Sequence, residues 1–463
     1  MKKYSIFFLA LLLVFQLRPV ASYATEQTAT GCTSLQANQA LAGNEKYTGT
    51  AQAAILYERN TQTLVYAHNP DERVNPTGLI KLLTALIVLE EGHLEDIVTV
   101  KRSTLNTVSP GAVSAGLKAG EQITVRDLLY CVMVASSNDA AAVIAEHVAG
   151  SQAAFVDKMN ARAATLGCVN THFTNVHGLQ DERQYSTARD MAIIVDEAMK
   201  NEDFLYYYGV TGYTVAATNS SASRQLKTTN YMMDPDSKYY DSRVIGGKPA
   251  AATSSDRSMI CAAKVGECEY LCVIISAKAK MSGGAVTRYT NFDEAKSLLD
   301  MGFGGYAVQQ VLGTEQPFGL YPVSEGENHV VVGPNRQVYA LLPVNFDASQ
   351  LQLRDVRNQD ALHAPLAEGT SVGKLQIFLG SILIGEADLI ARHDVAKLGT
   401  TIMPDIADDS AENGFPGKVL IIVFVLFSGG FLLILLLRIF RNSNKERPGK
   451  KAKRSTPRER GAV

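Results

Sequence analysis

The chain has 463 residues, of which 46% are apolar and 19% are charged, a composition typical of globular proteins. This length exceeds one comfortable hydrophobic core and indicates two or three domains. The formal net charge of −2 hides an asymmetry, because outside the first 24 and the last 26 residues 31 basic side chains stand against 44 acidic ones, which excludes a nucleic-acid-binding footprint.

The first 24 residues have the three regions of a secretory signal peptide. Lys2-Lys3 precedes an apolar run over residues 6–15, and Ser22-Tyr23-Ala24 supplies a small-residue cleavage site. We therefore expect export, with a mature chain that begins near Thr25. Residues 25–48 are small and polar and are predicted to form a tether.

The next segment predicts two strands and a central helix. Residues 53–57 and 63–67 have strand composition and are joined by a polar turn. Residues 75–86 predict a turn that runs into a helix apolar on nearly every side, which belongs in the centre of a domain. Lys81 is the only charge in residues 79–89. Because a buried ammonium is costly without partners, we expect a polar network around Lys81, either one that performs chemistry or the remnant of one.

The helical region that follows contains one polar interruption. Residues 125–147 show a helical pattern broken by Ser136-Ser137-Asn138-Asp139. Two serines and an asparagine inside apolar helical sequence predict a cap or an exposed turn between two helices. Further amphipathic helices are expected over residues 151–166 and 186–199, with Ser186 as the N-cap of the second.

Residues 242–252 precede a predicted hairpin, with strands at 259–263 and 270–275. A helix over residues 291–301 is expected to close the first domain near Gly305. Beyond it, short and evenly spaced strand candidates alternate with turn residues, which predicts a small all-β module. These candidates lie at residues 330–332, 338–342, 351–353, 375–379 and 382–384.

The C-terminal region predicts a membrane anchor. Residues 419–437 contain no charge, and at the helical rise this stretch is about 28 Å long, one bilayer core. An acidic linker over residues 401–414 precedes the span, which we place at 415–440. The tail, residues 441–463, is strongly basic, so the positive-inside rule places it in the cytoplasm and the bulk of the chain outside the cell.

The cysteines and histidines predict no metal site. None of the six cysteines has CxxC spacing, and the eight histidines show no HExxH or other paired ligand spacing, so we predict no metal and no cofactor. If Cys261 and Cys268 lie on the two arms of a hairpin that turns at residues 265–266, a cross-strand disulfide could join them. The alternative is that they are small buried thiols. The six are Cys32, Cys131, Cys168, Cys261, Cys268 and Cys272.

Three stretches carry a resemblance to a known family. They are Gly78-Leu79-Ile80-Lys81, Ser136-Ser137-Asn138 and Lys248-Pro249-Ala250. In their order and surroundings they resemble the S-x-x-K, S-x-N and K-T-G motifs of serine-type D-Ala-D-Ala carboxypeptidases, the low-molecular-mass penicillin-binding proteins. The second motif matches completely, and the similarity spans residues 50–305. Residues 364–374 also resemble the C-terminal domain of that family.

The resemblance implies a fold and a substrate. The fold is an α/β penicillin-binding/β-lactamase-like transpeptidase domain over residues 49–305, an antiparallel sheet flanked by helices with a helical subdomain, followed by a small all-β domain over residues 306–400. The implied partner is a peptidoglycan stem peptide or another cell-wall protein. The implied catalytic positions are Gly78, Lys81, Ser136 and Asn138, and the substrate-binding positions are Lys248, Pro249 and Ala250.

The first motif lacks its nucleophile. Residues three apart on a helix share a face, so in the family Lys can take the proton of a Ser one turn earlier while the helix N-terminal amides stabilise the oxyanion. Here Gly78 stands at the Ser position and has no atom with which to attack. Thr77 is the nearest hydroxyl, one position early, and is the candidate substitute. The only intact S-x-x-K, Ser371 to Lys374, lies in strand-like sequence and is interpreted as coincidence.

The third motif is changed as well. Pro249 and Ala250 replace Thr and Gly, which in the family bind the substrate carboxylate and let the peptide backbone approach the strand. Pro249 has neither a hydroxyl nor an N–H and suits a strand edge or a bulge, and Ala250 adds a Cβ. Lys248 is expected either to recognise an anionic peptide end or to be a surface lysine.

Two functions follow from these patterns. The first is a membrane-anchored extracellular pseudoenzyme that binds peptidoglycan or a cell-wall partner. In that case Lys81, Ser136 and Asn138 are a retained polar cluster around a buried lysine. The second is an active D-Ala-D-Ala carboxypeptidase in which Thr77 or a local shift rescues the changed motifs.

Overall fold

We describe the protein from a computed structural model in which residues 35, 39–42, 47–315 and 317–399 are described. The predicted signal peptide, acidic linker, membrane span and basic tail lie outside these residues. Within the described part of the chain, no helix is both long and apolar enough to cross a bilayer.

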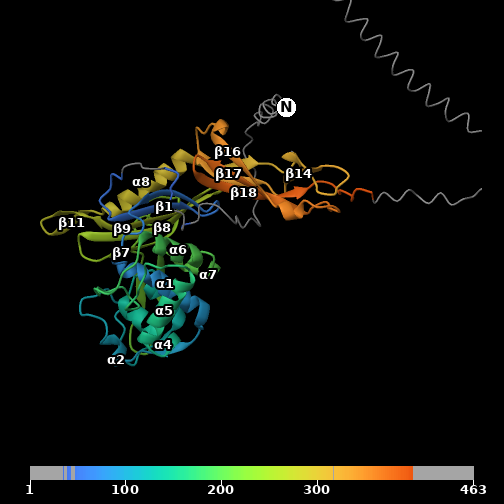
Figure 1. The fold of residues 1–463 in the computed structure, drawn as a ribbon. Coiled ribbons are helices and arrows are strands. Elements are labelled where there is room, and N and C mark those ends of the chain that lie inside the picture. The colour runs from blue at the N-terminus through green and yellow to red at the C-terminus, as the bar shows by residue number, and fades with distance from the viewer. Residues whose placement is uncertain (1–34, 36–38, 43–46, 316, 400–463) are drawn as a thin grey trace, which may run out of the picture. The chain divides into compact units, whose positions relative to one another are not determined.

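An antiparallel five-stranded sheet forms the centre of the first domain, in the order β2-β1-β9-β8-β7 (Figure 1). Strand β7 stands at one edge of this order and carries the third motif. The strands are β1 (Ala53–Glu58), β2 (Thr63–His68), β7 (Val244–Ala251), β8 (Asp256–Val265) and β9 (Cys268–Lys278).

The two faces of this sheet bury two separate cores, as the period of two along each strand requires. On β1, Ile55 and Tyr57 face the helical subdomain, while Ala54 and Leu56 face the opposite core. Helix α8 (Thr290–Gly305) covers that opposite face, and the other large helices lie on the first (Figure 1). Because both faces are covered, the central strands carry nearly continuous apolar sequence.

The helical subdomain contains the central helix and the helices around it. Its α-helices are α1 (Lys81–Glu91), α2 (Arg102–Leu105), α3 (Val125–Met133), α4 (Asn138–Ala149), α5 (Gln152–Thr165), α6 (Ala188–Ala198) and α7 (Glu202–Tyr208). Three two-stranded antiparallel sheets accompany the two layers: β3 (Ile97–Thr99) with β4 (Gln122–Thr124), β5 (Gly212–Val215) with β6 (Arg224–Lys227), and β10 (Lys280–Ser282) with β11 (Ala285–Arg288).

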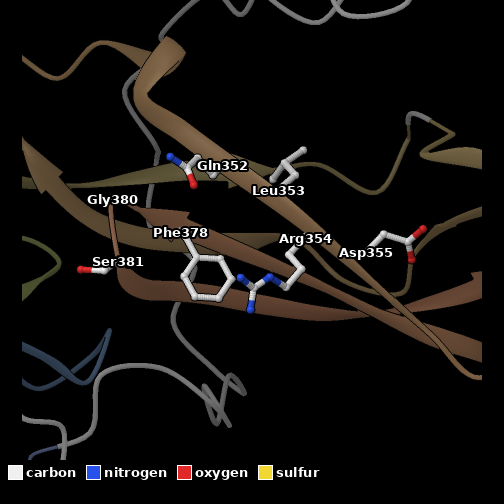
Figure 2. A pocket seen from close by; sticks show the side chains of 7 residues that line it. All are labelled: Gln352, Leu353, Arg354, Asp355, Phe378, Gly380 and Ser381. Carbon is white, nitrogen blue, oxygen red and sulfur yellow. The ribbon is translucent and has the colours of Figure 1, made fainter. Parts of the chain in front are cut away.

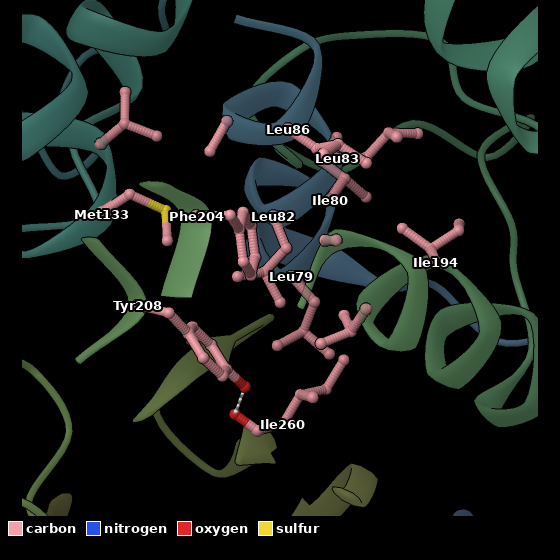
Figure 3. Close-up of a cluster of buried hydrophobic side chains, with 14 of the residues drawn as sticks. Leu79, Ile80, Leu82, Leu83, Leu86, Met133, Ile194, Phe204, Tyr208 and Ile260 are labelled. Atoms are coloured by element: carbon pink, nitrogen blue, oxygen red, sulfur yellow. Dashed lines mark hydrogen bonds between the residues drawn. The ribbon is translucent and has the colours of Figure 1, made fainter. Parts of the chain in front are cut away.

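The central helix is buried on all sides, as its sequence predicts. A 3₁₀ turn, η1 (Thr77–Ile80), leads directly into α1, and every residue of α1 from Lys81 to Val88 is buried. Leu79, Leu82 and the rings of Phe204 and Tyr208 belong to one buried core cluster (Figure 3). The Tyr208 hydroxyl donates a hydrogen bond to the Ile260 carbonyl of β8 at 2.9 Å. This packing fixes the position of Lys81 relative to the sheet.

The second domain is all-β, as predicted. One five-stranded sheet has the order β13-β14-β18-β17-β16, and β12 pairs with β15. Helix α8 ends at Gly305 and β12 starts at Tyr306, so the two domains follow each other without a gap. The strands are β12 (Tyr306–Leu312), β13 (Gly319–Tyr321), β14 (Val330–Pro334), β15 (Val338–Pro343), β16 (Leu351–Arg357), β17 (Ser371–Leu379) and β18 (Ile382–Ala391), with 3₁₀ turns η2 (Ala348–Gln350) and η3 (Gln359–Ala361).

Two local predictions were wrong. The tether prediction fails at its C-terminal end, because the backbone N–H groups of Leu41 and Ala42 donate to the Leu64 and Val65 carbonyls of strand β2. The cap of α6 is Thr187 rather than Ser186, since the Thr187 hydroxyl accepts from the Asp190 N–H. Ser186 instead bridges to Val74.

The cysteine alternatives are resolved in favour of thiols. The hairpin turns at residues 266–267, so Cys261 lies opposite Cys272, and Cys268 lies opposite Val265. A disulfide between Cys261 and Cys268 is therefore the wrong pairing. The described cysteines are free, and Cys32 lies outside the described residues.

Candidate active-site cleft

A cleft of about 440 Å³ lies where the first turn of the central helix meets β7 and the α3–α4 connection. Its walls come from seven separate parts of the sequence, which the sheet and the helical subdomain hold together. Six of the seven predicted catalytic and substrate-binding positions line it, and Lys248 does not. The six are Gly78, Lys81, Ser136, Asn138, Pro249 and Ala250.

Gly78 lies in η1, directly before the helix. A Cβ placed at this position would lie 3.4 Å from Lys81 Nζ, 3.6 Å from Ala250 Cβ and 3.8 Å from Ser136 Oγ. These are ordinary van der Waals distances, and the backbone is outside the left-handed region. Because residues three apart in a 3₁₀ turn eclipse each other, position 78 stands on the same side as Lys81. The cleft therefore has room for a side chain at position 78 that the sequence does not supply.

Lys81 is 2% exposed and makes two hydrogen bonds. Its Nζ donates to Asn138 Oδ1 at 2.8 Å and to the backbone carbonyl of His177 in a short contact. Burial, and then the nearby Lys248, lower the pKa of Lys81 well below its ordinary value. The predicted polar network around this lysine is therefore present, and no carboxylate takes part in it among the described residues.

The second motif is the connection between α3 and α4, in agreement with the predicted turn between helices. Ser136 has a left-handed backbone with φ +58°, which is uncommon for a residue other than glycine and is typical of strained functional sites. Asn138 is the first residue of α4. Its Nδ2 and its backbone N–H both donate to the Val113 carbonyl, at 2.9 and 2.8 Å. Asn138 thus ties the cleft loop at Val113 to the amine of Lys81.

The loop between α5 and α6 contributes more than the sequence indicated. His177 is not among the catalytic positions that the resemblance implies, but its backbone carbonyl accepts a hydrogen bond from Lys81. Gly178 has φ +81°, and a Cβ there would lie 1.9 Å from the Thr77 carbonyl oxygen. The backbone of Gly178 therefore packs directly against η1, the turn that carries Thr77 and Gly78. The only signal in the sequence was the family-like His-Gly-Leu context.

Lys248 lies beneath the cleft. It is 1% exposed, and its Nζ donates to the carbonyls of Val132 and Met133 at 3.0 and 3.3 Å, at the C-terminal end of α3. The expectation of a surface lysine was wrong, because β7 packs against this helix. Burial lowers the pKa of Lys248 to about 7.

This buried amine predicts a pH-dependent stability. Below pH 7 Lys248 is protonated in both states and the native state carries the full burial cost. Between about pH 7 and its ordinary 10.5 the unfolded chain holds a proton that the native state has released, so stability rises with pH. We expect the difference in free energy of unfolding between wild type and Lys248→Met to rise by up to about 1.4 kcal/mol per pH unit. Thermal melts from pH 6 to 9, with exposed Lys280→Met as the charge control, measure it, and a flat difference contradicts it.

The substituted residues of the third motif lie on β7, whose outer side is a sheet edge. Pro249 is thus at an edge, as its missing N–H predicted, and Ala250 presents its Cβ to the position of Gly78. The cross-strand partners of Ala250 and Ala251 are Ser258 and Arg257. Arg257 also lines the cleft, and the sequence analysis missed it because the register of the hairpin was unknown.

Aromatic and amide side chains complete the opposite wall. Tyr231 and Tyr289 lie 5.4 Å apart between ring centroids, and the Arg257 guanidinium stands 4.9 Å from the Tyr289 ring. Asn291 is 1% exposed, and its Oδ1 has no hydrogen-bond partner among the described residues. Since an unpaired buried acceptor is costly, this oxygen is a candidate contact for a ligand N–H.

The candidate substitute nucleophiles do not reach the cleft. Thr77 is 4% exposed, its Oγ1 has no hydrogen-bond partner among the described residues, and it is not among the residues that line the cleft. Ser371 and Lys374 lie on β17 of the second domain, where both are exposed, and neither lines the cleft. That S-x-x-K match is therefore coincidental, as interpreted.

A second hollow, in the β domain, lacks comparable chemistry. It lies over β16 and β17, where the Arg354 guanidinium stands 5.0 Å from the Phe378 ring (Figure 2). Asp355 and Ser381 complete its polar lining. No nucleophile–base pair lies there, so the cleft of the first domain is the candidate active site. Among the described residues, no cluster of three or more His, Cys, Asp or Glu could hold a metal ion.

Comparisons with known proteins give family matches for both domains. A family model described as D-alanyl-D-alanine carboxypeptidase matches residues 39–279, and one described as the C-terminal domain of penicillin-binding protein 5 matches residues 307–397. The D-alanyl-D-alanine carboxypeptidase DacF of Bacillus subtilis is 27% identical over 352 residues, 75% of this chain and 87% of that one. DacA of Haemophilus influenzae is 29% identical over 360 residues, 76% and 86% of the two chains.

The chain is also similar to solved structures. Penicillin-binding protein 5 from Haemophilus influenzae is similar with a TM-score of 0.61 and 28% identity, covering 77% of this chain and all of that chain. The D-alanyl-D-alanine carboxypeptidase DacD from Francisella tularensis has a TM-score of 0.60, covers 80% of this chain and 99% of its own, and at 21% identity supports the fold alone.

Proposed function

Because the chain belongs to the D-alanyl-D-alanine carboxypeptidase family, we propose that it binds peptidoglycan stem peptides in the cleft but does not form the acyl-enzyme of an active member. The observation that carries this proposal is the cleft around Gly78. Lys81, Ser136 and Asn138 are assembled there, yet the residue that would attack has no side chain. The chain is then a pseudoenzyme, or an impaired enzyme, that keeps three polar residues of the active site.

The charge of the cleft supports an anionic peptide as its ligand. Among the described residues that line it, Arg257 is a cation, Lys81 is an amine with a lowered pKa, and none is a carboxylate. An arginine fork suits a terminal carboxylate. The unpaired Asn291 oxygen supplies an acceptor for a peptide N–H. A stem peptide that ends in a D-Ala carboxylate satisfies both groups.

Changes at two separate places in the cleft, at Gly78 and on β7, argue against acyl transfer. Pro249 removes a hydroxyl and an N–H from the strand edge, and the Cβ of Ala250 narrows the approach. Loss of a nucleophile costs on the order of 10⁶ in kcat in a serine protease, while binding groups survive its loss. Two independent changes in one cleft are therefore better explained by a cleft no longer used for acyl transfer than by a neutral accident.

We further propose that the cleft lies outside the cell, anchored by a single C-terminal span at residues 415–440. The signal-like N-terminus and the basic tail motivate this placement. A chain truncated after residue 400 should be absent from the membrane fraction and should appear in the medium or the periplasm. Retention of the truncated chain in the membrane would argue against the anchor.

The test of the proposed function uses the full chain in detergent. A fluorescent penicillin should leave no covalent band on the wild-type protein, by gel fluorescence and intact mass. A peptide ending in D-Ala-D-Ala should bind reversibly, by calorimetry, and Arg257→Gln should weaken this binding by at least tenfold. The same peptide ending in D-Ala-L-Ala is the matched ligand control.

The labelling result and the peptide-binding result can contradict the proposal independently of each other. A covalent band abolished by Thr77→Ala would replace the pseudoenzyme with an active carboxypeptidase in which Thr77 attacks. Absence of both labelling and peptide binding would show that the cleft no longer recognises stem peptides.

A further inference from the structure

Cys261 and Cys272 lie directly opposite each other on the neighbouring strands β8 and β9. The side chains of directly opposite residues leave a sheet on the same face. Both cysteines are 0% exposed and belong to the core that helix α8 covers (Figure 1). Both are free thiols in this structure. The sheet therefore places two reduced cysteines side by side in one buried layer.

The register alone brings this pair within the range of a disulfide. Residues directly opposite each other in an antiparallel pair have Cα atoms about 4.5 or about 5.5 Å apart. A disulfide needs a Cα separation of about 4.4–6.8 Å. The thiols also contact each other, because a hydrogen bond between them is the largest cause that raises the pKa of Cys272 well above its ordinary value. A bond between Cys261 and Cys272 therefore needs no change in strand pairing.

We propose that an intramolecular disulfide joins Cys261 to Cys272 in the exported chain. Disulfides form and persist outside the cytoplasm, and the signal-like N-terminus is the reason to place this domain there. The bond does not depend on what the cleft binds. It shares with the proposed function only the placement of the domain outside the cell.

The oxidant is the disulfide of a thiol–disulfide oxidoreductase. One cysteine of the pair attacks a sulfur of that disulfide as a thiolate, which forms a mixed disulfide and releases one thiolate of the oxidoreductase. The second cysteine then attacks the sulfur of the first, so that the Cys261–Cys272 bond forms and the mixed disulfide breaks. Two electrons pass to the oxidoreductase, which leaves as a dithiol with the two protons that the cysteines lose.

The bond forms before the domain is fully packed. In the native chain an oxidant does not reach the pair, since both thiols are 0% exposed and the Ala295 carbonyl of α8 lies 4.0 Å from Cys272 Sγ. The hairpin of β8 and β9 precedes α8 in the chain, and hairpins form locally within microseconds. The two thiols therefore meet while the oxidoreductase still has access to them.

Peptide mapping of the exported full chain, purified in detergent, tests the bond. Free thiols are blocked with a maleimide in denaturant, and the chain is digested with trypsin without reductant. Cleavage after Arg257, Lys264 and Lys278 gives the fragments 258–264 and 265–278. We expect the two fragments to be covalently joined, with Cys268 carrying the maleimide, and to separate after reduction.

Cys272→Ala and Cys268→Ala are the matched variants, because both cysteines lie on the fragment 265–278. Cys272→Ala should abolish the link, and Cys268→Ala should keep it. The burial of the bond has its own measurement. Dithiothreitol should break the link in the native chain on the order of 10²-fold more slowly than in denaturant, because the reductant reaches it only after unfolding.

The contrary results are distinct from those of the proposed function. Unlinked fragments from a chain that has lost residues 1–24 overturn the inference, as does a link that persists in Cys272→Ala or one reduced equally fast in the native chain. None of these results concerns peptide binding by the cleft. If the chain is not exported, the proposed placement fails instead. Cell-free synthesis of the full chain in detergent, with glutathione disulfide and an oxidoreductase, then decides whether the pair closes, and unlinked fragments there overturn the inference too.

Discussion

Gly78→Ser should strongly increase acylation of the protein by penicillin. A serine Cβ fits at 3.4–3.8 Å from Lys81, Ser136 and Ala250, and its hydroxyl, about 1.4 Å further, reaches hydrogen-bond distance of the amine. Lys81 can then take the proton and the first turn of the helix can stabilise the oxyanion. We expect labelling by fluorescent penicillin to rise by at least 10³-fold over wild type, a fraction of the roughly 10⁶ attributed to a serine nucleophile.

The size of this gain also shows how much the changed third motif limits acylation. A triple variant that adds Pro249→Thr and Ala250→Gly should label faster than Gly78→Ser alone, because it restores the hydroxyl and the close approach on β7. Gly78→Ala is the matched control and should remain unlabelled. If the triple variant folds and binds peptide but stays unlabelled, the cleft has drifted at more than these three positions.

Gly178→Ala should destabilise the cleft more than any other glycine-to-alanine change on its loops. The residue has φ +81°, and its new Cβ would lie 1.9 Å from the Thr77 carbonyl and 2.7 Å from the Gly78 nitrogen. Backbone atoms cannot yield as a flexible side chain can, so the loop must move away from Lys81. We expect a cost of about 3 kcal/mol or more in the free energy of unfolding.

The matched control for this change is Gly150→Ala. Gly150 ends α4 with φ +79°, but a Cβ there meets nothing within 4 Å. Gly150→Ala should therefore lower the free energy of unfolding only by the strain of an alanine in a left-handed conformation, about 1 kcal/mol. Thermal melting of both variants, with peptide binding as a second measurement, separates strain from steric conflict. Equal melting temperatures would contradict the contact with Thr77.

Much of the fold was predictable from residue patterns. The apolar run around Lys81 predicted a central helix, and the strand composition of residues 53–57 and 63–67 with the polar turn between them predicted two joined strands, which the structure confirms. Both rest on local periodicity, which the chain displays without reference to distant residues. The polar break at Ser136 and Asn138 likewise predicted the boundary between α3 and α4.

Contacts between distant segments were not predictable in this way. The partner of Lys81 at His177 is 96 residues away, and Lys248 reaches carbonyls 115 and 116 residues away. That Cys261 lies opposite Cys272 on the neighbouring strand depends on the position of the hairpin turn, which is one residue further along the chain than predicted. Such contacts follow from the register of strands and the packing of helices, and a shift of one residue changes every partner.

The amino-acid sequence by itself determined that this chain keeps the lysine and the S-x-N motif of its family and lacks the serine at position 78, because identity and spacing need no third dimension. Only the tertiary structure decided that Thr77 stays outside the cleft, that Lys248 is buried, and that position 78 has room for a side chain beside Lys81. The physical reason is that burial and proton affinity belong to the packed environment of a side chain, which elements far apart in the chain create together.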